Sequence, residues 1–210
     1  MEESAGNLGI LSARVPKRRV LRDPRDRWYN LRIHGSTGGS HMLYIRNADA
    51  ADLPRITEIY RYAQEQMIRS GNPTQWGRSY PDEALILSDI QGGACRVICS
   101  DEDIHGVFAL FEGADPTYCR IEGGRWPNDA PYITIHRMAG DGRVHGLFAC
   151  AAEYCRGLCR NIRVDTHADN RIMQRCAEKQ GFIPCGIIRL RDGSPRIAYQ
   201  WTADRKEGPL

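Results

Sequence analysis

The stretch that decides the fold lies at residues 132–147 and reads YITIHRMAGDGRVHGL. Its first part, Tyr132–Met138, is rich in β-branched and aromatic residues and predicts a β-strand. The following loop contains Gly140, Gly142 and Gly146, and the apolar spacing after it predicts a helix at about 146–159. The stretch therefore predicts a strand that runs through a glycine-rich loop into a helix.

A junction of this kind suits an anionic ligand such as a diphosphate. Backbone N–H groups of a glycine-rich turn can point at the anion, and the dipole of the following helix adds to the attraction. The loop matches neither GxxxxGK[ST] nor GxGxxG, which disfavours a nucleotide P-loop and a dinucleotide-binding turn. A plain strand-to-helix turn explains the glycines equally well, so both interpretations stay open at this point.

The segments on either side of this stretch predict a mixed α/β domain. The expected elements are a strand at 42–46, helices at 52–69 and 84–90, strands at 95–100, 106–111 and 132–138, a helix at 146–159, a strand at 162–165, a helix at 169–180 and strands at 182–190 and 196–201. The order β-α-α-β-β-β-α-β-α-β-β suits a mixed sheet with helices on both faces.

The first 41 residues differ in composition from the rest of the 210-residue chain. They carry a net charge of +4, against −1 for the remainder, and end in a linker-like Gly-Ser-Thr-Gly-Gly-Ser run. We predict a flexible basic extension at 1–41, with Met42 as an alternative start of the native protein, and a working domain at 42–210. A basic tethering arm is the alternative. Since the domain itself is nearly neutral, a nucleic-acid partner is not expected.

Targeting and cysteine patterns suggest a cytoplasmic protein. No run approaches the roughly 18 apolar residues of a membrane span, so no membrane association is expected. The eight cysteines form no CxxC pair and have no histidine at zinc-finger spacing, so we expect small, partly buried residues and no metal. A reducing cytoplasm fits this usage best.

The chain resembles the GNAT (GCN5-related) N-acetyltransferase family in two segments. Arg143, Gly146 and Phe148 stand at the defined positions of the family's phosphate loop; the first two agree, and Phe148 replaces a small residue. A helix that opens at Asn170 and closes at Gly181-Phe182 is similar to the family's C-terminal half. Together with the element order, the resemblance spans about 42–202.

The resemblance implies a mostly antiparallel sheet with one splayed parallel strand pair, at 132–138 and 162–166. Pantetheine of acetyl-CoA would bond to the backbone between these strands like an added strand. The implied cofactor-binding residues are Met138, Ala139, Arg143, Val144, His145, Gly146, Leu147 and Asn170.

Transfer of an acetyl group to an amine needs a base for the ammonium proton. His136 is the first candidate because a neutral imidazole titrates near working pH, and His167 is the second. Glu122 is a third possibility. For each of them a purely structural role is the alternative. Family members often carry a tyrosine as the acid that protonates the leaving thiolate, but here the position is Ala177, so the resemblance supplies no acid.

The acceptor pocket is expected between two aromatic loops. Aromatic rings with amide or carboxylate neighbours can hold a small polar amine through cation–π contacts and hydrogen bonds. Core packing would explain any one of these rings equally well. The candidate substrate-binding residues are Gln75, Trp76, Tyr80, Tyr118, Glu122 and Trp126.

The resemblance implies an N-acetyltransferase that uses acetyl-CoA, a small-molecule amine and no metal, as a monomer or homodimer. The alternative is a non-catalytic acyl-CoA-binding module that serves as a sensor or interaction domain, which Ala177 and Phe148 favour. Acylation of a protein terminus or lysine ranks lower, since the aromatic loops suggest a closed pocket.

Overall fold

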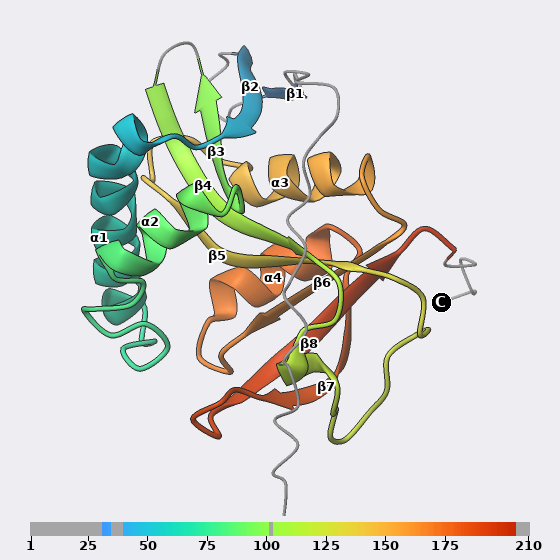
Figure 1. Cartoon of the computed structure of the whole chain (residues 1–210). Helices are drawn as coiled ribbons and strands as arrows, with labels where there is room; N and C mark the ends of the chain where they lie inside the picture. The colour runs from blue at the N-terminus through green and yellow to red at the C-terminus, as the bar shows by residue number, and fades with distance from the viewer. Residues whose placement is uncertain (1–30, 35–39, 101–102, 205–210) are drawn as a thin grey trace, which may run out of the picture.

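The described chain forms a mixed sheet with helices on both faces (Figure 1). This computed structural model describes residues 31–34, 40–100 and 103–204. The strands are β1 (Leu31–His34), β2 (Ser40–Asn47), β3 (Cys95–Ser100), β4 (Asp103–Glu112), β5 (Ile133–Gly140), β6 (Asn161–Thr166), β7 (Ile183–Arg189) and β8 (Pro195–Thr202). The α-helices are α1 (Leu53–Arg69), α2 (Glu83–Gln91), α3 (Leu147–Arg156) and α4 (Arg171–Lys179), and short 3-10 helices lie at Ala50–Asp52 and Pro116–Tyr118.

The strands follow the order β1-β2-β3-β4-β5-β6-β8-β7. Each neighbouring pair is antiparallel except β5 and β6, which are parallel. The predicted α/β fold class, with a mostly antiparallel sheet and one parallel pair, is therefore confirmed. Every strand and helix expected between 42 and 202 is present, with ends shifted by a few residues.

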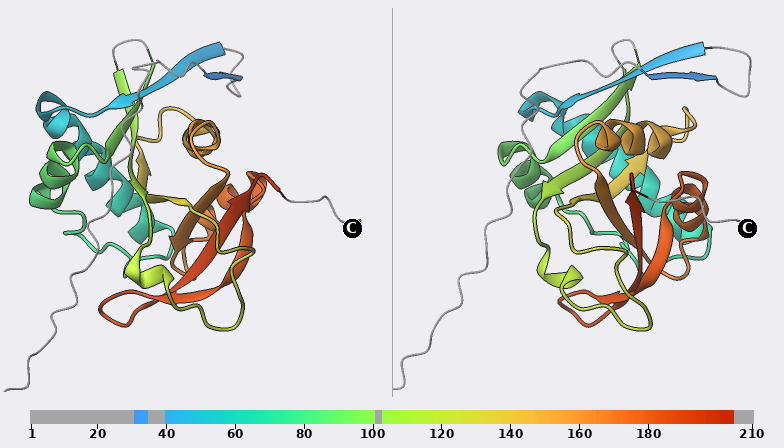
Figure 2. Two further views of the ribbon diagram at one scale, coloured as in Figure 1. Left: turned by 45° about the vertical axis from the view of Figure 1, so that its right-hand side comes forward. Right: turned by 90° about the vertical axis from the view of Figure 1, so that its right-hand side faces the viewer.

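Two apolar clusters hold the helices against opposite faces of the sheet (Figure 2). On one face, α1 and α2 pack on β3 through Ile56, Ile59 and Ile86. On the other, α3 and the end of α4 cover β4, β5 and β6, with Phe148 and Phe182 in ring contact at 5.7 Å. Burial of these side chains drives the association, at roughly 25 cal/mol per Å² of apolar surface.

The parallel pair β5 and β6 is short and then parts. Only Ile133↔Ile162 and Thr134↔Arg163 are in register, although β5 continues to Gly140 and β6 to Thr166. Pairing of β5 with β4 shifts by one residue near this point, and Arg137 there has a φ of 52°. A bulge of this kind bends its strand. The bulge and the parting of β5 from β6 leave one edge of the β5 backbone without a strand partner beyond Thr134.

The start of the first domain strand lies earlier than expected. Residues 40–41, assigned from the sequence to the extension, begin β2, and residues 31–34 form β1 beside it. The rest of the predicted extension, residues 1–30 and 35–39, lies outside the described residues. Within the described chain, no helix combines the length and apolar character needed to cross a membrane.

Candidate active site

The loop between β5 and α3 presents backbone rather than side chains at the start of the helix. Gly146 is the N-cap of α3 with a φ of 80°, a left-handed conformation that favours glycine, and it makes no side-chain cap. The first N–H groups of an α-helix lack intrahelical partners. The loop therefore places unshielded donors at the positive end of the α3 dipole.

Close packing determines where this loop lies. A Cβ at Gly140 would come within 2.6 Å of Leu147 Cδ1, so glycine there lets the start of α3 approach the end of β5. A Cβ at Gly142 would overlap the Tyr62 hydroxyl of α1. Seven of the eight predicted cofactor residues thus lie around one junction: Met138 and Ala139 lie at the end of β5, and Arg143, Val144, His145, Gly146 and Leu147 lie on the loop and the first residue of α3. The eighth, Asn170, lies at the start of α4.

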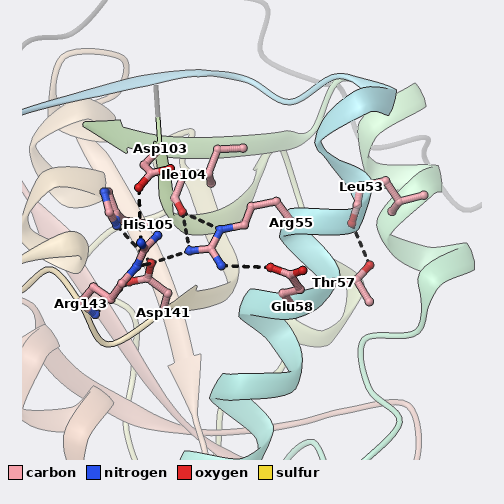
Figure 3. A network of polar contacts seen from close by, with 9 residues as sticks. All are labelled: Leu53, Arg55, Thr57, Glu58, Asp103, Ile104, His105, Asp141 and Arg143. Carbon is pink, nitrogen blue, oxygen red and sulfur yellow. Dashed lines mark hydrogen bonds and ion pairs between the residues drawn. The ribbon is translucent and has the colours of Figure 1, made fainter. Parts of the chain in front are cut away.

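Two guanidinium groups surround the Asp141 carboxylate in this loop (Figure 3). Its carboxylate accepts hydrogen bonds from Arg143 Nε at 2.6 Å and from Arg55 of α1 at 2.6 Å. Burial opposes ionisation of Asp141, but the bonds from Arg143 and from His105 outweigh it and lower the pKa of the carboxyl. The carboxylate is balanced by two guanidinium groups, so it presents no net repulsion to a diphosphate bound at the loop.

His136 lies between two carboxylates where β5 and β6 part. Its Nε2 is 3.2 Å from Asp115 Oδ2 and its Nδ1 is 3.8 Å from Asp165 Oδ1. Since an ionised carboxylate only accepts, Nε2 donates to Asp115, and Nδ1 carries the lone pair of the neutral ring. A proton on Nδ1 would face the Asp165 carboxylate.

The ring of Tyr118 completes this cluster from the loop before β5. Its hydroxyl donates to Asp165 Oδ1 at 2.6 Å, and its ring centroid lies 6.0 Å from that of His136. Burial raises the pKa of Tyr118 well above its ordinary value, and the charge of Asp165 adds to this effect. Tyr118 therefore stays protonated and acts as a fixed donor, which keeps Asp165 in place beside His136.

The other aromatic candidates take part mainly in packing. Trp126 donates to the Tyr118 carbonyl oxygen at 3.0 Å and stacks on the Arg163 guanidinium at 3.8 Å. Trp76 is buried, with its ring 5.7 Å from that of Tyr60. Tyr80 is 41% exposed, so it remains accessible from solvent.

Gln75 and Asn170, predicted on different sites, contact each other. Asn170 Nδ2 donates to Gln75 Oε1 at 3.0 Å, while Asn170 Oδ1 accepts from the N–H of Met173 and caps α4. The α1–α2 loop is thereby joined to the start of α4. Both polar atoms of the Asn170 side chain are engaged within the protein, and its contact with a cofactor stays a prediction.

His167 and Glu122 lie apart from the His136 cluster. His167 Nδ1 accepts from the N–H of Asp169 at 3.2 Å, in the turn after β6. Glu122 pairs with Arg189 of β7 at 3.1 Å, and this bond lowers the pKa of the Glu122 carboxyl. The structure thus brings together His136, Tyr118 and two aspartates, and leaves the other two candidate bases with local structural contacts.

Sequence reasoning missed Asp165 and Arg137 as parts of this site. Alternation along β6 puts Arg163 and Asp165 on one face and Ile162 and Val164 on the other, a signal that could have paired Asp165 with His136. The Arg137 guanidinium bonds to Asp89 of α2 at 2.7 Å. Nothing in the local sequence indicates that partner. Among the described residues, no group of three His, Cys, Asp or Glu side chains could hold a metal ion.

Several solved structures share this fold. A GNAT-family acetyltransferase from Streptococcus agalactiae is 29% identical, with a TM-score of 0.68 over 78% of this chain and 96% of that chain. A GNAT-family acetyltransferase from Listeria monocytogenes is 16% identical, with a TM-score of 0.59 over 82% and 99%. A protein of Salmonella typhimurium, solved with its cofactor acetyl-CoA, is 17% identical, with a TM-score of 0.50 over 80% and 98%.

These similarities support conclusions of different strength because the sequence identities differ. At 16% and 17% identity, the Listeria and Salmonella proteins show the fold alone. The Streptococcus protein is nearer in sequence and is matched over almost its whole length. No protein-family model and no curated protein matches the chain.

Proposed function

The chain belongs to the GNAT family of acetyltransferases, and we propose that it transfers an acetyl group from acetyl-CoA to the amine of a small polar acceptor by direct attack in a ternary complex. The observation that carries the proposal is the parting of β5 from β6 beside a loop whose backbone donors open α3. An extended, diphosphate-bearing ligand fits both features at once.

The residues at this junction suit the parts of acetyl-CoA. The backbone of Met138 and Ala139 would bond to the pantetheine arm, and the loop from Arg143 to Leu147 would hold the diphosphate. The bound cofactor supplies an activated thioester. Ala139 pairs with Val107 of β4 on one side, which leaves the other edge of its backbone for such bonds.

His136 would accept the proton of the attacking amine. Its Nδ1 carries the lone pair, and Asp165 stands 3.8 Å away to stabilise the charge that develops on the ring. Asp115 fixes the tautomer from the other side at 3.2 Å. In the same way, other catalytic histidines accept a proton on one ring nitrogen while a carboxylate orients the other.

The position of the usual acid holds a small apolar residue. Ala177 is buried on α4, within the cluster that covers β6. The chain therefore offers no hydroxyl there, and the thiolate would leave unassisted, which an ordinary thiol pKa of about 8.5 allows.

The acceptor would be a small amine. Tyr80 lies in the α1–α2 loop with Gln75 and Trp76. It is exposed and accepts a hydrogen bond from Arg137, so this loop would supply the outer wall of the pocket. Tyr118 would set the inner wall beside His136. Trp126, which packs on Arg163, and Glu122, which pairs with Arg189 apart from this cluster, stay predictions as substrate-binding residues.

Thermal unfolding of the full chain with and without acetyl-CoA tests the cofactor. At 100 times its dissociation constant a ligand adds about 2.7 kcal/mol, and each kcal/mol moves a domain of this size by about 2–4 °C. We expect a rise of several degrees, followed by release of CoA thiol when amines are added. No shift at millimolar acetyl-CoA would overturn the assignment.

Turnover separates the enzyme from the alternative sensor. Ala177 and the buried Phe148 are the features that favour a module that binds acyl-CoA without catalysis. A protein that is stabilised by acetyl-CoA but releases no CoA with any amine of a broad panel would be such a module.

A further inference from the structure

A buried carboxylate at the start of the phosphate loop receives donors from three parts of the chain (Figure 3). Asp141 Oδ1 accepts from the N–H of Arg143 at 2.9 Å. Asp141 Oδ2 accepts from Arg143 Nε and from Arg55, each at 2.6 Å, and lies 3.1 Å from His105 Nδ1. The Asp141 side chain is only 6% exposed, so these bonds are shielded from water.

We propose that Asp141 is a positioning residue for cofactor binding: with Arg55 and His105 it holds the loop backbone so that its N–H groups meet the diphosphate. This inference rests on the proposed function. It assigns a role to α1 and β4, neither of which carries a predicted cofactor-binding residue.

Arg55, which holds Asp141 from α1, is itself anchored on β4, and the Asp141 backbone is anchored on the same strand. Arg55 donates to the carbonyl oxygen of Ile104 from Nε at 3.1 Å and from an Nη at 2.9 Å. The N–H of Asp141 donates to the carbonyl oxygen of His105 at 2.9 Å. The loop is thus tied to β4 through its backbone and to α1 through Arg55, and its start has little freedom to move.

The same residues carry Ser-His-Asp contacts that could suggest a nucleophile. Ser100 Oγ lies 2.9 Å from His105 Nε2, and His105 Nδ1 faces Asp141. Because the carboxylate accepts from Nδ1, Nε2 accepts from the serine hydroxyl. Two guanidinium groups already bond to Asp141, however, and both Ser100 and His105 are buried, so a substrate does not reach the serine hydroxyl. The arrangement fits a structural tie.

The charge of Asp141 and its positioning of the loop predict opposite effects of Asp141→Asn on CoA affinity. Asp141→Asn removes a negative charge beside the loop, which by electrostatics alone would strengthen binding of an anion. It also replaces one oxygen acceptor by an N–H₂ donor. Whichever way the amide turns, this N–H₂ faces either the three side-chain donors at Oδ2 or the backbone N–H of Arg143 at Oδ1, which forces the loop to shift. The sign of the change in affinity therefore distinguishes the two effects.

The experiment is calorimetric titration of CoA into the full chain and its Asp141→Asn variant at 25 °C. We expect the dissociation constant for CoA to rise at least about tenfold. A role confined to stability would lower the unfolding temperature and leave this constant unchanged in the folded protein. An unchanged or tighter constant in folded Asp141→Asn overturns the inference.

Asp103→Asn is the matched control. Asp103 pairs with the same Arg143 at 3.3 Å from an exposed position and makes no bond to the loop backbone among the contacts of the described residues. Its removal takes away the same charge, so we expect CoA to bind as tightly as before or more tightly. Weakening equal to that of Asp141→Asn would overturn the positioning role.

A second pair of variants serves if Asp141→Asn does not fold. Arg55→Met removes the tie from α1, and Arg61→Met removes a cation from the same helix at a position that lines a cavity against Arg78 and Pro81. We expect weaker CoA binding for Arg55→Met only. Equal constants in the two variants overturn the inference, and a wild-type chain that binds no CoA overturns the proposed function with it.

Discussion

The side chains that contact His136 come from distant parts of the chain. Asp115 and Tyr118 belong to the loop before β5, and Asp165 lies on β6. The two ring nitrogens of His136 each face one carboxylate, at 3.2 and 3.8 Å. A lone histidine in a strand would lack this support, and the contacts distinguish His136 from His167.

At this scale we predict the effect of His136→Ala. Loss of a general base lowers rates by about 10²–10⁴-fold, so kcat with the best amine should fall at least about 100-fold. The dissociation constant for acetyl-CoA should stay within about twofold, since the residue lies outside the predicted cofactor contacts. Thiol release and calorimetry measure the two quantities.

His167→Ala is the control for this prediction. Its imidazole contacts Asp169 within its own turn and should affect the rate little. A near-normal rate for His136→Ala at every pH tested, or a collapse of the rate only in His167→Ala, would assign the base to another residue.

At the scale of elements, the start of α3 is shaped by glycine. Gly146 adopts a φ of 80° at the N-cap, where a residue with a Cβ is strained by about 1–2 kcal/mol. The conformation turns the chain from the loop into the helix and leaves its first N–H groups open. The predicted anion site thus depends on backbone geometry at one residue.

We predict that Gly146→Glu weakens CoA binding by at least about tenfold, because a carboxylate would stand against the diphosphate. Gly193→Glu is a matched control: its φ is 81° in the β7–β8 turn, with nothing within 4 Å of an added Cβ. Both variants carry similar backbone strain. Equal CoA affinity in folded Gly146→Glu and Gly193→Glu would refute the placement of the diphosphate.

At the scale of the whole molecule, largely buried carboxylates join helix α1 to the strand and the loop beside it. Asp52, at the start of α1, accepts two bonds from Arg46 of β2, at 2.6 and 2.8 Å. Burial opposes its ionisation, but Arg46 outweighs this and lowers the pKa of Asp52 from 3.8. Asp141, which joins the loop to α1, has a lowered pKa for similar reasons.

These shifts predict loss of stability in acid. A carboxyl whose pKa is lower in the folded state stabilises the fold fully above its ordinary value, and this contribution disappears as pH falls through the folded-state pKa. Asp52→Asn should lower the free energy of unfolding by about 1–3 kcal/mol at pH 7. The difference from wild type should shrink below about pH 4.

Urea denaturation at pH 7, 5 and 3 measures this difference. A gap between wild type and Asp52→Asn that stays constant over the whole range would show that the charge of Asp52 contributes nothing to folding. The comparison between the two proteins at each pH cancels the contributions of all other carboxyls that titrate independently of Asp52.

Much of the fold could be predicted because its signals are local. Runs rich in β-forming residues predicted β3 and β4, helical spacing predicted α1, and glycines marked the loop before α3. β1 was missed, since the alternation in its four residues, Leu-Arg-Ile-His, is too short to stand out as a strand. The β5 bulge at Arg137 was missed too, because a non-glycine residue with positive φ leaves no mark in the sequence.

The candidate site could be predicted only in part. The loop from Arg143 to Leu147 follows from glycine spacing and family resemblance, both properties of neighbouring residues. The partners of His136 do not, because Asp115 and Asp165 are 21 and 29 positions away in the sequence and reach it through strand pairing and loop packing.

The sequence by itself determined the order of the strands and helices between 42 and 202 and the glycine-rich loop before α3, since propensity, periodicity and glycine act over a few residues. Only the tertiary structure decided which charges meet. Arg55, His105 and Asp141 come from a helix, a strand and a loop, and their contact depends on how those elements pack, because ionic and hydrogen-bond energies depend on distances of a few ångströms that no local pattern encodes.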